Sequence, residues 1–341
     1  MGSTIKDIAD TAGVSTATVS RVINNPEQVS PETRVRIEKI IEEKGYKPNI
    51  FARGLMKSRT DSVGILVSHL VNPYITSIVD TMESILSRSG TYIYLCNCKQ
   101  AKQLEREYTA ELLRRNVDAL IVVETLSFSS PDNFFTDLES PCPIILVNEH
   151  LSVSTRHHIV RCDQEPGIRE ALHFLLSKEL FPIALFVGDT HQYSFRLKER
   201  LFMEFKREQG LPDAQVQIHR LFGETNNEDI VAKSADYAFQ LFTGRNRPRS
   251  ILAGNDLIAL GILQAAQKTG ISIPDELSVI GVDNTLLSRT SLIPLSTIDL
   301  RTEDVGRMAA ELYLKLRNSR QQLPEPIHET IPSFLRLRST T

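Results

Sequence analysis

The stretch AGVSTATVSRVINNPEQVSPETR, residues 12–34, decides how the first part of this 341-residue chain folds. Gly13 is a typical helix stop, Ser15 is a typical helix cap, and an Asn-Asn-Pro run ends the intervening helix near Asn24. Residues 30–32, Ser-Pro-Glu, then start another helix, with the cap, the proline and the acid each in a favoured position.

A further helix precedes this stretch. Over residues 4–12, apolar side chains recur at i, i+3, i+4 and i+7, and Thr4 is placed to cap the helix. Helices over 4–12 and 15–24, joined by the tight turn Ala-Gly-Val-Ser, predict a helix-turn-helix, and a helix over 30–44 completes a three-helix head. The second helix turns three aliphatic residues inward: Val19, Val22 and Ile23.

The other face of the second helix carries short side chains and one cation: Thr16, Ala17, Ser20 and Arg21. Short side chains let a helix enter the major groove of DNA, where Arg21 can donate to O6 and N7 of guanine and Ala17 can contact a thymine methyl group. The alternative is an ordinary solvated helix, and the motif alone leaves both interpretations open.

Charge is unevenly distributed along the chain. Residues 1–60 contain ten Lys and Arg against seven Asp and Glu, whereas the remaining 281 residues contain 29 against 35. A basic head on an acidic body indicates a polyanionic partner at one end.

The composition predicts a soluble, cytoplasmic protein of two or three domains. Hydrophobic residues make up 41% of the chain, no apolar run approaches the ~20 residues of a membrane span, and the first ten residues contain no apolar signal core. Cys96, Cys98, Cys142 and Cys162 lack the spacing of a zinc site, which favours buried thiols in a reducing compartment. We therefore expect no metal, no cofactor and no contact with a membrane.

Residues 46–60, YKPNIFARGLMKSRT, predict a linker with a short helical patch from Asn49 to about Lys57. A helix this short is not stable alone in water, so it folds only if it docks. One interpretation is a plain linker. The other is a hinge that folds on DNA and inserts Leu55 between base pairs.

Beyond residue 61, apolar β-rich runs alternate with amphipathic helical stretches, a pattern typical of doubly wound parallel sheets. The predicted strands cover residues 63–68, 92–97, 118–123, 143–148, 183–188, 250–255 and 278–282. Ligands of such sheets bind at the carboxyl ends of the strands. Two such lobes with a cleft between them predict a small-molecule receptor.

Two other classes of protein share parts of this pattern: a sugar-binding transport protein, and an α/β enzyme fused to a helix-turn-helix. The DNA-binding head and the absence of a signal peptide disfavour the first. The chain contains no G-x-G-x-x-G, G-x-x-x-x-G-K-[ST], H-E-x-x-H or G-x-S-x-G motif, and its eight histidines show no ligand spacing, so an enzyme is not expected.

Several segments resemble the LacI/GalR family of bacterial repressors. They are TIKDIADTAGVSTATVSRVINN (4–25), VSPETRVRIEKIIEEKGYKPN (29–49), ARGLMKSRTDSVGIL (52–66), NPY (72–74), AGNDLIALG (253–261), GISIPDELSVIGVDN (270–284) and STIDLRTEDVGRMAAELYL (296–314), so the resemblance spans essentially the whole chain.

The resemblance implies a helix-turn-helix head at residues 1–48, a hinge helix and linker at 49–60, and a periplasmic-binding-protein-like, effector-binding and dimerisation body at 61–341. In the family the two lobes of the body interleave, which implies one lobe from residues 62–161 with 292–323 and the other from 163–290 with 324–341.

The resemblance also implies partners and individual roles. Paired hinge helices of a homodimer enter the minor groove at the centre of a palindromic double-stranded operator. DNA contacts are implied for Thr16, Ala17, Ser20, Arg21, Asn49, Ala52 and Leu55. Effector contacts are implied for Tyr74, Arg196, Lys198, Phe222, Asn255 and Asp283. The chain ends in SFLRLRSTT with no leucine heptad, so a dimer is expected rather than a tetramer.

The effector residues admit simpler interpretations. Asn255 and Asp283 follow predicted strands, as binding residues do, but these residues, with Asp256 and Asn284, are also typical helix caps and loop residues. In the segment SFRLKER (194–200), Arg196 and Lys198 both fit the position where the family has an effector-binding cation.

If Ser194 caps this helix, Arg196 and Lys198 lie in its first turn, where the helix dipole disfavours cations and a bound anion can offset them. The alternative is a surface helix whose cations pair with Glu199 and Glu204. The expected effector is therefore a sugar, a sugar acid or a sugar phosphate. Leu201-Phe202 stand where the family usually has a glycine-aromatic pair, and Glu149 stands where arginine is frequent, so the effector is not transferable from relatives.

Overall fold

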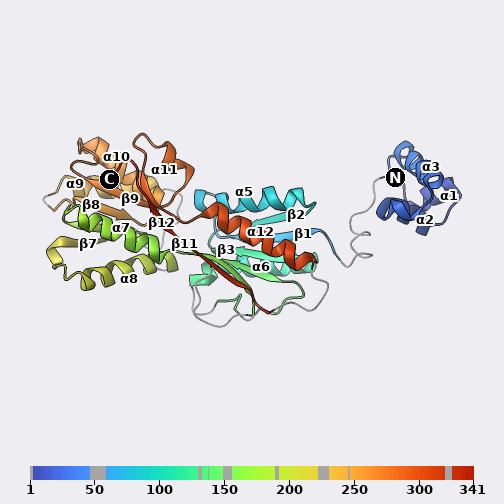
Figure 1. Ribbon diagram of the computed structural model, residues 1–341, viewed down its shortest axis with the longest axis horizontal. Helices are drawn as coiled ribbons and strands as arrows, with labels where there is room; N and C mark the ends of the chain where they lie inside the picture. Colours follow the sequence, from blue (N-terminus) through green and yellow to red (C-terminus); the bar gives the residue numbers. More distant parts are fainter. Residues whose placement is uncertain are drawn as a thin grey trace. The chain divides into compact units, whose positions relative to one another are not determined.

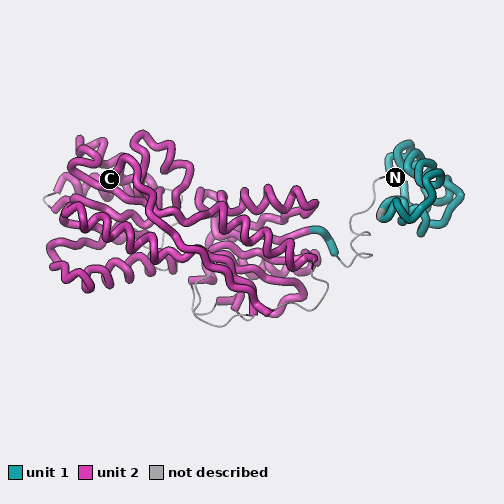
Figure 2. Tube along the Cα trace, in the orientation of Figure 1, with its two compact units in different colours: residues 1–61 teal, residues 62–341 magenta. Residues whose placement is uncertain are grey.

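A computed structural model describes residues 3–46, 59–129, 133–136, 138–148, 156–188, 192–221, 230–244, 246–318 and 325–341. The chain forms two compact units, residues 1–61 and residues 62–341 (Figure 2).

The first unit is a three-helix head. Its elements are α1 (Ile5–Ala12), α2 (Thr16–Asn24), the 3-10 turn η1 (Pro26–Gln28) and α3 (Pro31–Glu43). Thr4 and Asp7 form a capping box at the start of α1, and Gly13 ends that helix in the left-handed conformation, with φ of +65°. At the start of α2, the Ser15 hydroxyl accepts a hydrogen bond from the Thr18 amide at 3.1 Å. The predicted helix-turn-helix is therefore confirmed.

A small apolar core holds the three helices of the head together. It consists of Ile8, Ala9, Ala12, Val19, Val22 and Ile37. Ile8, Val19 and Ile37 come from three different helices, and each is fully buried. The packing fixes which face of α2 turns inward and leaves the opposite face to solvent.

The second unit contains two six-stranded sheets (Figure 1). The first sheet has the order β11-β5-β4-β3-β1-β2, and the second has the order β12-β10-β9-β8-β6-β7. All neighbours are parallel except β12, which runs antiparallel to β10. The strands are β1 (Ser62–Val67), β2 (Tyr92–Asn97), β3 (Ala119–Val123), β4 (Ile144–Val147), β5 (His158–Asp163), β6 (Ile183–Val187), β7 (Val216–Arg220), β8 (Ser250–Ala253), β9 (Ser278–Asp283), β10 (Ser296–Asp299), β11 (His328–Pro332) and β12 (Phe334–Arg336).

Helices lie on both faces of each sheet (Figure 1). They are α5 (Pro73–Arg88), α6 (Lys102–Arg114), α7 (Glu165–Ser177), α8 (Tyr193–Glu208), α9 (Ile230–Phe242), α10 (Asp256–Thr269), α11 (Leu286–Thr290) and α12 (Thr302–Asn318), with 3-10 turns η2 (Leu126–Ser129) and η3 (Asp213–Gln215). In β1, Ile65 joins the core beneath α5 and α12, whereas its neighbour Leu66 joins a second core beneath α6. Burial on both faces explains why the parallel strands read as continuous apolar runs.

The helices α5 and α12 lie close together on the first sheet. A Cβ atom on Gly306 would lie only 2.6 Å from the carbonyl oxygen of Ile78. Glycine is therefore required at this position because no side chain fits between the two helices.

We call the first sheet with α5, α6 and α12 the first lobe, and the second sheet with α7 to α11 the second lobe. The chain crosses between the lobes at Gln164, at residues 300–301 and at Ser333. Two crossings are tied together, because the Ser333 hydroxyl accepts a hydrogen bond from the Gly167 amide at 3.0 Å.

The crossings correct the predicted lobe boundaries. Residues 296–299 pair with β9 in the second lobe, although residues 292–323 were expected in the first. Residues 328–332 pair with β5 in the first lobe, although residues 324–341 were expected in the second. These short strands, STID and HETIP, contain too few apolar residues to show which sheet they join, and their partners in the fold decide it.

All seven predicted strands are confirmed, with ends within two residues of those expected. The strands β5, β7, β10, β11 and β12 were not predicted. Two of them, β7 (VQIHR) and β12 (FLR), contain charged or polar residues. Both are edge strands, which need no continuous apolar run.

Among the described residues, no helix is both long and apolar enough to cross a membrane. In the same segments, no three His, Cys, Asp or Glu side chains gather where they could hold a metal ion. The four cysteines are unpaired. Cys98, Cys142 and Cys162 are buried, and Cys96 is half-buried.

Candidate functional site

The exposed face of α2 is the candidate DNA-reading surface. Thr16, Ala17 and Arg21 are exposed, and Ser20 is partly buried. The cap at Ser15 fixes the start of the helix, and its first turn contains no acidic residue that would repel DNA. The predicted hinge residues Asn49, Ala52 and Leu55 lie outside the described residues.

A cleft lies between the lobes, at the carboxyl ends of the strands. We call the part of it that Tyr74 and Lys198 line the inner compartment, which encloses about 360 Å³ of space, some of it open to solvent. Four of the predicted effector residues line it: Tyr74, Lys198, Asn255 and Asp283. Arg196 lies outside it, and Phe222 lies outside the described residues. Glu124 and Gln164, which were not predicted, also line it.

Asn255 has both of the roles considered for it. Its side-chain oxygen accepts a hydrogen bond from the Ile258 amide at 2.9 Å and so caps α10, and the residue also lines the inner compartment.

Asp256 has a structural role instead. Its carboxylate is fully buried and accepts hydrogen bonds from the Thr285 amide at 2.8 Å and from the Thr297 hydroxyl at 2.6 Å.

Three residues at strand ends have left-handed backbones. The φ angles are +45° at Glu124, +58° at Asn148 and +115° at Asp283. Such angles cost a non-glycine residue on the order of 1–3 kcal/mol, and they concentrate at functional sites. The same strand-end position that led to Asp283 could have led to Glu124, which directly follows the predicted strand 118–123.

A chain of hydrogen bonds orients the phenol of Tyr74. The side-chain oxygen of Asn148 accepts from the Cys162 amide at 3.0 Å, and its amide nitrogen donates to the Tyr74 hydroxyl oxygen. The Tyr74 hydroxyl in turn hydrogen-bonds to the Glu124 carboxylate. Because the phenol already accepts from Asn148, its proton is directed at Glu124.

Lys198 links α8 of the second lobe to Gln164, at a crossing between the lobes. Its side chain is 2% exposed. The ammonium group donates to the side-chain oxygen of Gln164 at 2.9 Å and to the carbonyl oxygen of Ser194 at 3.3 Å. Burial lowers the pKa of Lys198 to about 8, and the charges of Asp283 and Glu124 oppose this by favouring the protonated form.

The pKa values of the two acids, Glu124 and Asp283, are raised, whereas that of Lys198 is lowered. Burial raises the pKa of Glu124 to about 7, against the opposing charge of Lys198 and the hydrogen bond from Tyr74. Burial and the charge of Asp256 raise the pKa of Asp283 well above its usual range, again against Lys198. The inner compartment thus holds the buried cation Lys198, the buried acid Asp283 and the half-buried acid Glu124, with hydrogen-bond donors and acceptors side by side.

Arg196 makes a contact between the lobes. Its guanidinium donates to the carbonyl oxygen of Ser129 at 3.2 Å, and the Tyr193 amide donates to the Ser129 hydroxyl at 2.9 Å. Helix α8 begins at Tyr193 with Gln192 as its cap, so the predicted cap at Ser194 is wrong. Arg196 is therefore the fourth residue of α8 and still lies in its first turn, whereas Lys198 lies beyond it, where the helix dipole has little effect.

Replacing Glu124 with glutamine should stabilise the body at pH 8 and leave it unchanged at pH 4.5. The pKa of Glu124 is raised from 4.5 to about 7, so between these values the folded protein keeps a proton that the unfolded chain has lost. The free energy of unfolding therefore falls as pH rises through this window, and glutamine avoids that loss. We expect a gain of about 1–3 kcal/mol at pH 8, reduced by the lost pairing with Lys198. Urea unfolding at both pH values measures it, and an equal effect at both would contradict the assignment.

A helix-turn-helix head on a chain whose body has a polar cleft between two α/β lobes defines a ligand-controlled DNA-binding protein. Residues 4–49 match the family described as "Bacterial regulatory proteins, lacI family". Residues 172–341 match the family described as "Periplasmic binding protein-like domain". The chain is 29% identical over 343 residues to the HTH-type transcriptional regulator DegA of Bacillus subtilis, covering 97% of this chain and 99% of DegA. It is 30% identical over 315 residues to the HTH-type transcriptional repressor PurR of Vibrio atlanticus, covering 92% of this chain and 91% of PurR.

Solved structures share the fold. A lac repressor dimer bound to operator and an anti-inducer is similar with a TM-score of 0.81 at 23% identity, covering 100% of this chain and 99% of the repressor. The transcriptional regulator CelR in complex with cellobiose is similar with a TM-score of 0.66 at 22% identity, covering 99% and 100% of the two chains. The chain belongs to the lacI family of bacterial regulatory proteins, and it is a DNA-binding transcriptional regulator rather than an enzyme.

Proposed function

We propose that this regulator binds a palindromic operator as a homodimer and that an uncharged sugar in the cleft controls the binding. Thr16, Ala17 and Arg21 read bases in each half-site, and Ser20 contacts the backbone. In the hinge, Asn49, Ala52 and Leu55 contact the operator, and Leu55 enters the central base step. The inner compartment binds the effector through Tyr74, Lys198, Asn255 and Asp283.

The single observation that carries the effector class is the charge around Lys198. The pKa of Glu124 is raised to about 7 and that of Lys198 is lowered to about 8, so near pH 7.5 the Glu124 carboxylate offsets the ammonium group. Asp283, whose pKa is raised well above its usual range, stays protonated, so no unpaired cation is left for an anionic effector. Sugar hydroxyls both donate and accept, which suits carboxylates beside an ammonium group and an amide. Of the three classes of effector expected from the sequence, a sugar, a sugar acid or a sugar phosphate, we therefore propose the uncharged sugar.

Exposed apolar side chains support the dimer. The edge strand β2 exposes Tyr92 by 65% and Leu95 by 41% of their surfaces, and in the second lobe Leu286 and Leu292 are 69% and 87% exposed. Clusters of large apolar residues on a soluble protein are typical of protein interfaces, and a two-fold axis would bury the same patches on both copies.

The test uses operator DNA that the full chain selects from a random pool. Gel-shift titrations at pH 7.5 then compare uncharged sugars with their anionic partners, for example glucose with gluconate and glucose 6-phosphate. We expect an effective uncharged sugar to change operator affinity by about tenfold or more, and its anionic partners to have little effect. The variant Glu124→Gln removes the carboxylate that offsets Lys198 near pH 7.5 and should reduce this discrimination.

A sugar phosphate that acts as strongly as its uncharged parent would contradict the uncharged effector. A selected site without two-fold symmetry would contradict the dimer on a palindrome.

A further inference from the structure

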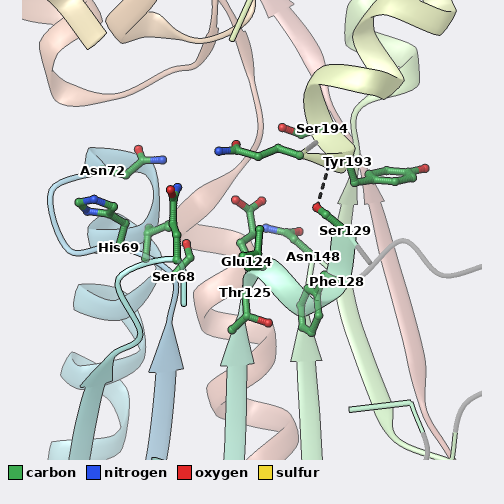
Figure 3. Close-up of a pocket in the computed structure, with 14 residues that line it drawn as sticks. Ser68, His69, Asn72, Glu124, Thr125, Phe128, Ser129, Asn148, Tyr193 and Ser194 are labelled. Atoms are coloured by element: carbon green, nitrogen blue, oxygen red, sulfur yellow. Dashed lines mark hydrogen bonds between the residues drawn. The ribbon is translucent and has the colours of Figure 1, made fainter. Parts of the chain in front are cut away.

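A second hollow lies beside the chain crossing at residues 300–301, and we call it the crossing pocket. It is an open hollow of about 550 Å³, within the range of about 300–1,000 Å³ that is typical of ligand sites. Among the described residues, it shares no lining residue with the inner compartment or with the part of the cleft drawn in Figure 3. The crossing pocket is therefore separate from the proposed sugar site.

Both lobes contribute to the crossing pocket. The second lobe supplies Arg289 on α11 and Arg336 in β12, and the first lobe supplies Thr302 at the start of α12. At the cleft, the lobes are tied by the hydrogen bond from the Tyr193 amide to the Ser129 hydroxyl, drawn as a dashed line in Figure 3. A ligand in the crossing pocket would connect the lobes at a second place.

The crossing pocket is rich in guanidinium groups. Arg301 pairs with Asp304 at 2.8 Å, and Arg336 contacts Asp299 at 3.4 Å. These two arginines are therefore offset by carboxylates. In all, four arginines line the pocket: Arg289, Arg301, Arg336 and Arg338.

The other two arginines, Arg289 and Arg338, contact only uncharged oxygens among the described residues. The Arg338 guanidinium donates to the side-chain oxygen of Asn284 at 2.5 Å and to the carbonyl oxygen of Leu295 at 2.6 Å. Arg289 donates to the carbonyl oxygen of Asn284 at 3.3 Å. A guanidinium group has five N–H donors, so both side chains keep donors for a ligand while Asn284 holds them near each other.

The arginines of the second lobe lie near enough to repel one another. Burial and the positive charges of Arg289 and Arg336 lower the pKa of Arg338, whereas the charges of Asp256 and Asp299 oppose this shift. The group remains protonated at neutral pH. An anion bound between these guanidinium groups would relieve the repulsion.

The shape and chemistry of the pocket favour an organic phosphate. Guanidinium groups bind phosphate oxygens through pairs of parallel hydrogen bonds. Inorganic phosphate would occupy only a small part of the volume. The hydroxyl of Thr302 and the exposed carboxylate of Glu303 also line the pocket, and they suit hydroxyl groups better than a second anion.

The crossing pocket and the inner compartment are lined by adjacent residues of the same segments. Asn284 lines the pocket, and Asp283 before it lines the inner compartment. Leu300 lines the inner compartment, and its neighbours Asp299 and Arg301 line the pocket. A ligand in the pocket therefore bears on the segments that position residues of the cleft.

We propose that the crossing pocket is a second effector site, which binds a small organic phosphate that also carries hydroxyl groups. Arg289 and Arg338 bind the phosphate group, and Thr302 contacts a hydroxyl group. Because the ligand contacts both lobes, its binding changes the affinity for the operator. The site does not depend on which ligand occupies the cleft.

The first test measures binding to the full-length protein by calorimetry at pH 7.5 and constant ionic strength. The probes are glycerol 3-phosphate, ribose 5-phosphate and glucose 6-phosphate, with inorganic phosphate, malate and citrate for comparison. We expect at least one organic phosphate to bind about tenfold or more tightly than inorganic phosphate.

The decisive variant is Arg289→Gln, which should weaken the organic phosphate by about tenfold or more. Arg289→Lys keeps the charge but not the paired donors, so its affinity should lie between those of wild type and Arg289→Gln. The matched control is Arg307→Gln. Arg307 is also exposed, on α12, but it pairs with Asp304 and does not line the pocket, so its loss should change binding by less than about twofold.

A folding defect will not obscure the result, because Arg289 is exposed and its replacement leaves no buried group unpaired. The melting temperature and the sedimentation coefficient of Arg289→Gln without ligand should equal those of the wild type.

The second test measures the operator affinity by gel-shift titration without sugar. A saturating organic phosphate should change this affinity by about fivefold or more in the wild type and not in Arg289→Gln. The cleft variant Glu124→Gln should keep the full effect. An effect of glucose 6-phosphate that disappears in Arg289→Gln arises in the crossing pocket and leaves the uncharged cleft effector standing.

Three results would overturn the phosphate site: no organic phosphate binds more tightly than inorganic phosphate, malate or citrate binds more tightly than every phosphate, or Arg307→Gln weakens binding as much as Arg289→Gln. Binding that persists in Arg289→Gln and tightens in Glu124→Gln would place the anion in the cleft, and would overturn both this site and the uncharged effector. Binding in the pocket without a change in operator affinity would overturn its role as an effector site.

Discussion

Replacing Arg21 with alanine will reduce affinity for the operator by roughly 30-fold to 10,000-fold. A bidentate arginine–guanine contact contributes about 1–3 kcal/mol, and a dimer on a palindrome loses two of them. Arg21 is exposed on α2, whose inward face is fixed by Val19 and Val22, so the side chain is directed away from the head's own core. The measurement is a gel-shift titration with the selected operator and with unrelated DNA at matched salt. The loss should be confined to the operator.

The matched control for Arg21→Ala is Arg36→Ala. Arg36 is also exposed in the head, but it lies on α3, outside the two helices of the helix-turn-helix. If Arg36→Ala weakens both DNAs slightly and Arg21→Ala weakens them by the same amount, Arg21 contributes only charge. Repeating the site selection with Arg21→Ala should also relax one base in each half-site, and an unaltered consensus would contradict base reading.

The second large effect is expected from Asp256→Ala, which should lower the free energy of unfolding of the body by about 3–5 kcal/mol. The Asp256 carboxylate accepts from the Thr285 amide at 2.8 Å, the Thr285 hydroxyl at 2.9 Å and the Thr297 hydroxyl at 2.6 Å. Burial raises its pKa to about 6, against these hydrogen bonds, so the group is ionised at pH 7.5. Alanine leaves three donors without this acceptor.

Asp256→Ala should also weaken effector binding, although Asp256 does not line the cleft. The bonds to Thr285 hold the turn that follows Asp283 and Asn284, whose φ angles of +115° and +56° need support from their surroundings. Urea unfolding at pH 7.5 measures the stability, and calorimetry with the effective sugar measures the binding.

Asp236→Ala is the matched control for Asp256→Ala. Asp236 is exposed on α9, and its removal should change stability by less than about 0.5 kcal/mol. An equal, small effect of both substitutions would mean that the buried carboxylate does not support the turn.

The candidate site shows where prediction from sequence reached its limit. Asp283, Asn255 and Tyr74 follow apolar runs or open helices, and the strand-end rule therefore identified them. Glu124 follows the rule equally well, because it comes directly after the strand predicted at residues 118–123, but it was not among the predicted residues. Gln164 could not have been found in this way, because it lies at a crossing between the lobes and its role depends on contact with Lys198.

Local sequence by itself determined the head. Its helices begin and end at caps and stops that act within a few residues, such as Thr4 with Asp7 and Gly13 at the end of α1. The central strands were also determined locally, because strands buried on both faces must be apolar throughout.

Only the tertiary structure decided which lobe each of the last strands joins and what surrounds Lys198. The strands β10 and β11 acquire their partners from distant segments, and their own side chains are compatible with either sheet. The sequence placed Lys198 on a helix as a cation that could attract an anion. The fold places it near Glu124 and Asp283, from opposite lobes, and because electrostatic energy depends on distance in space, the local sequence could not reveal the charge of the site.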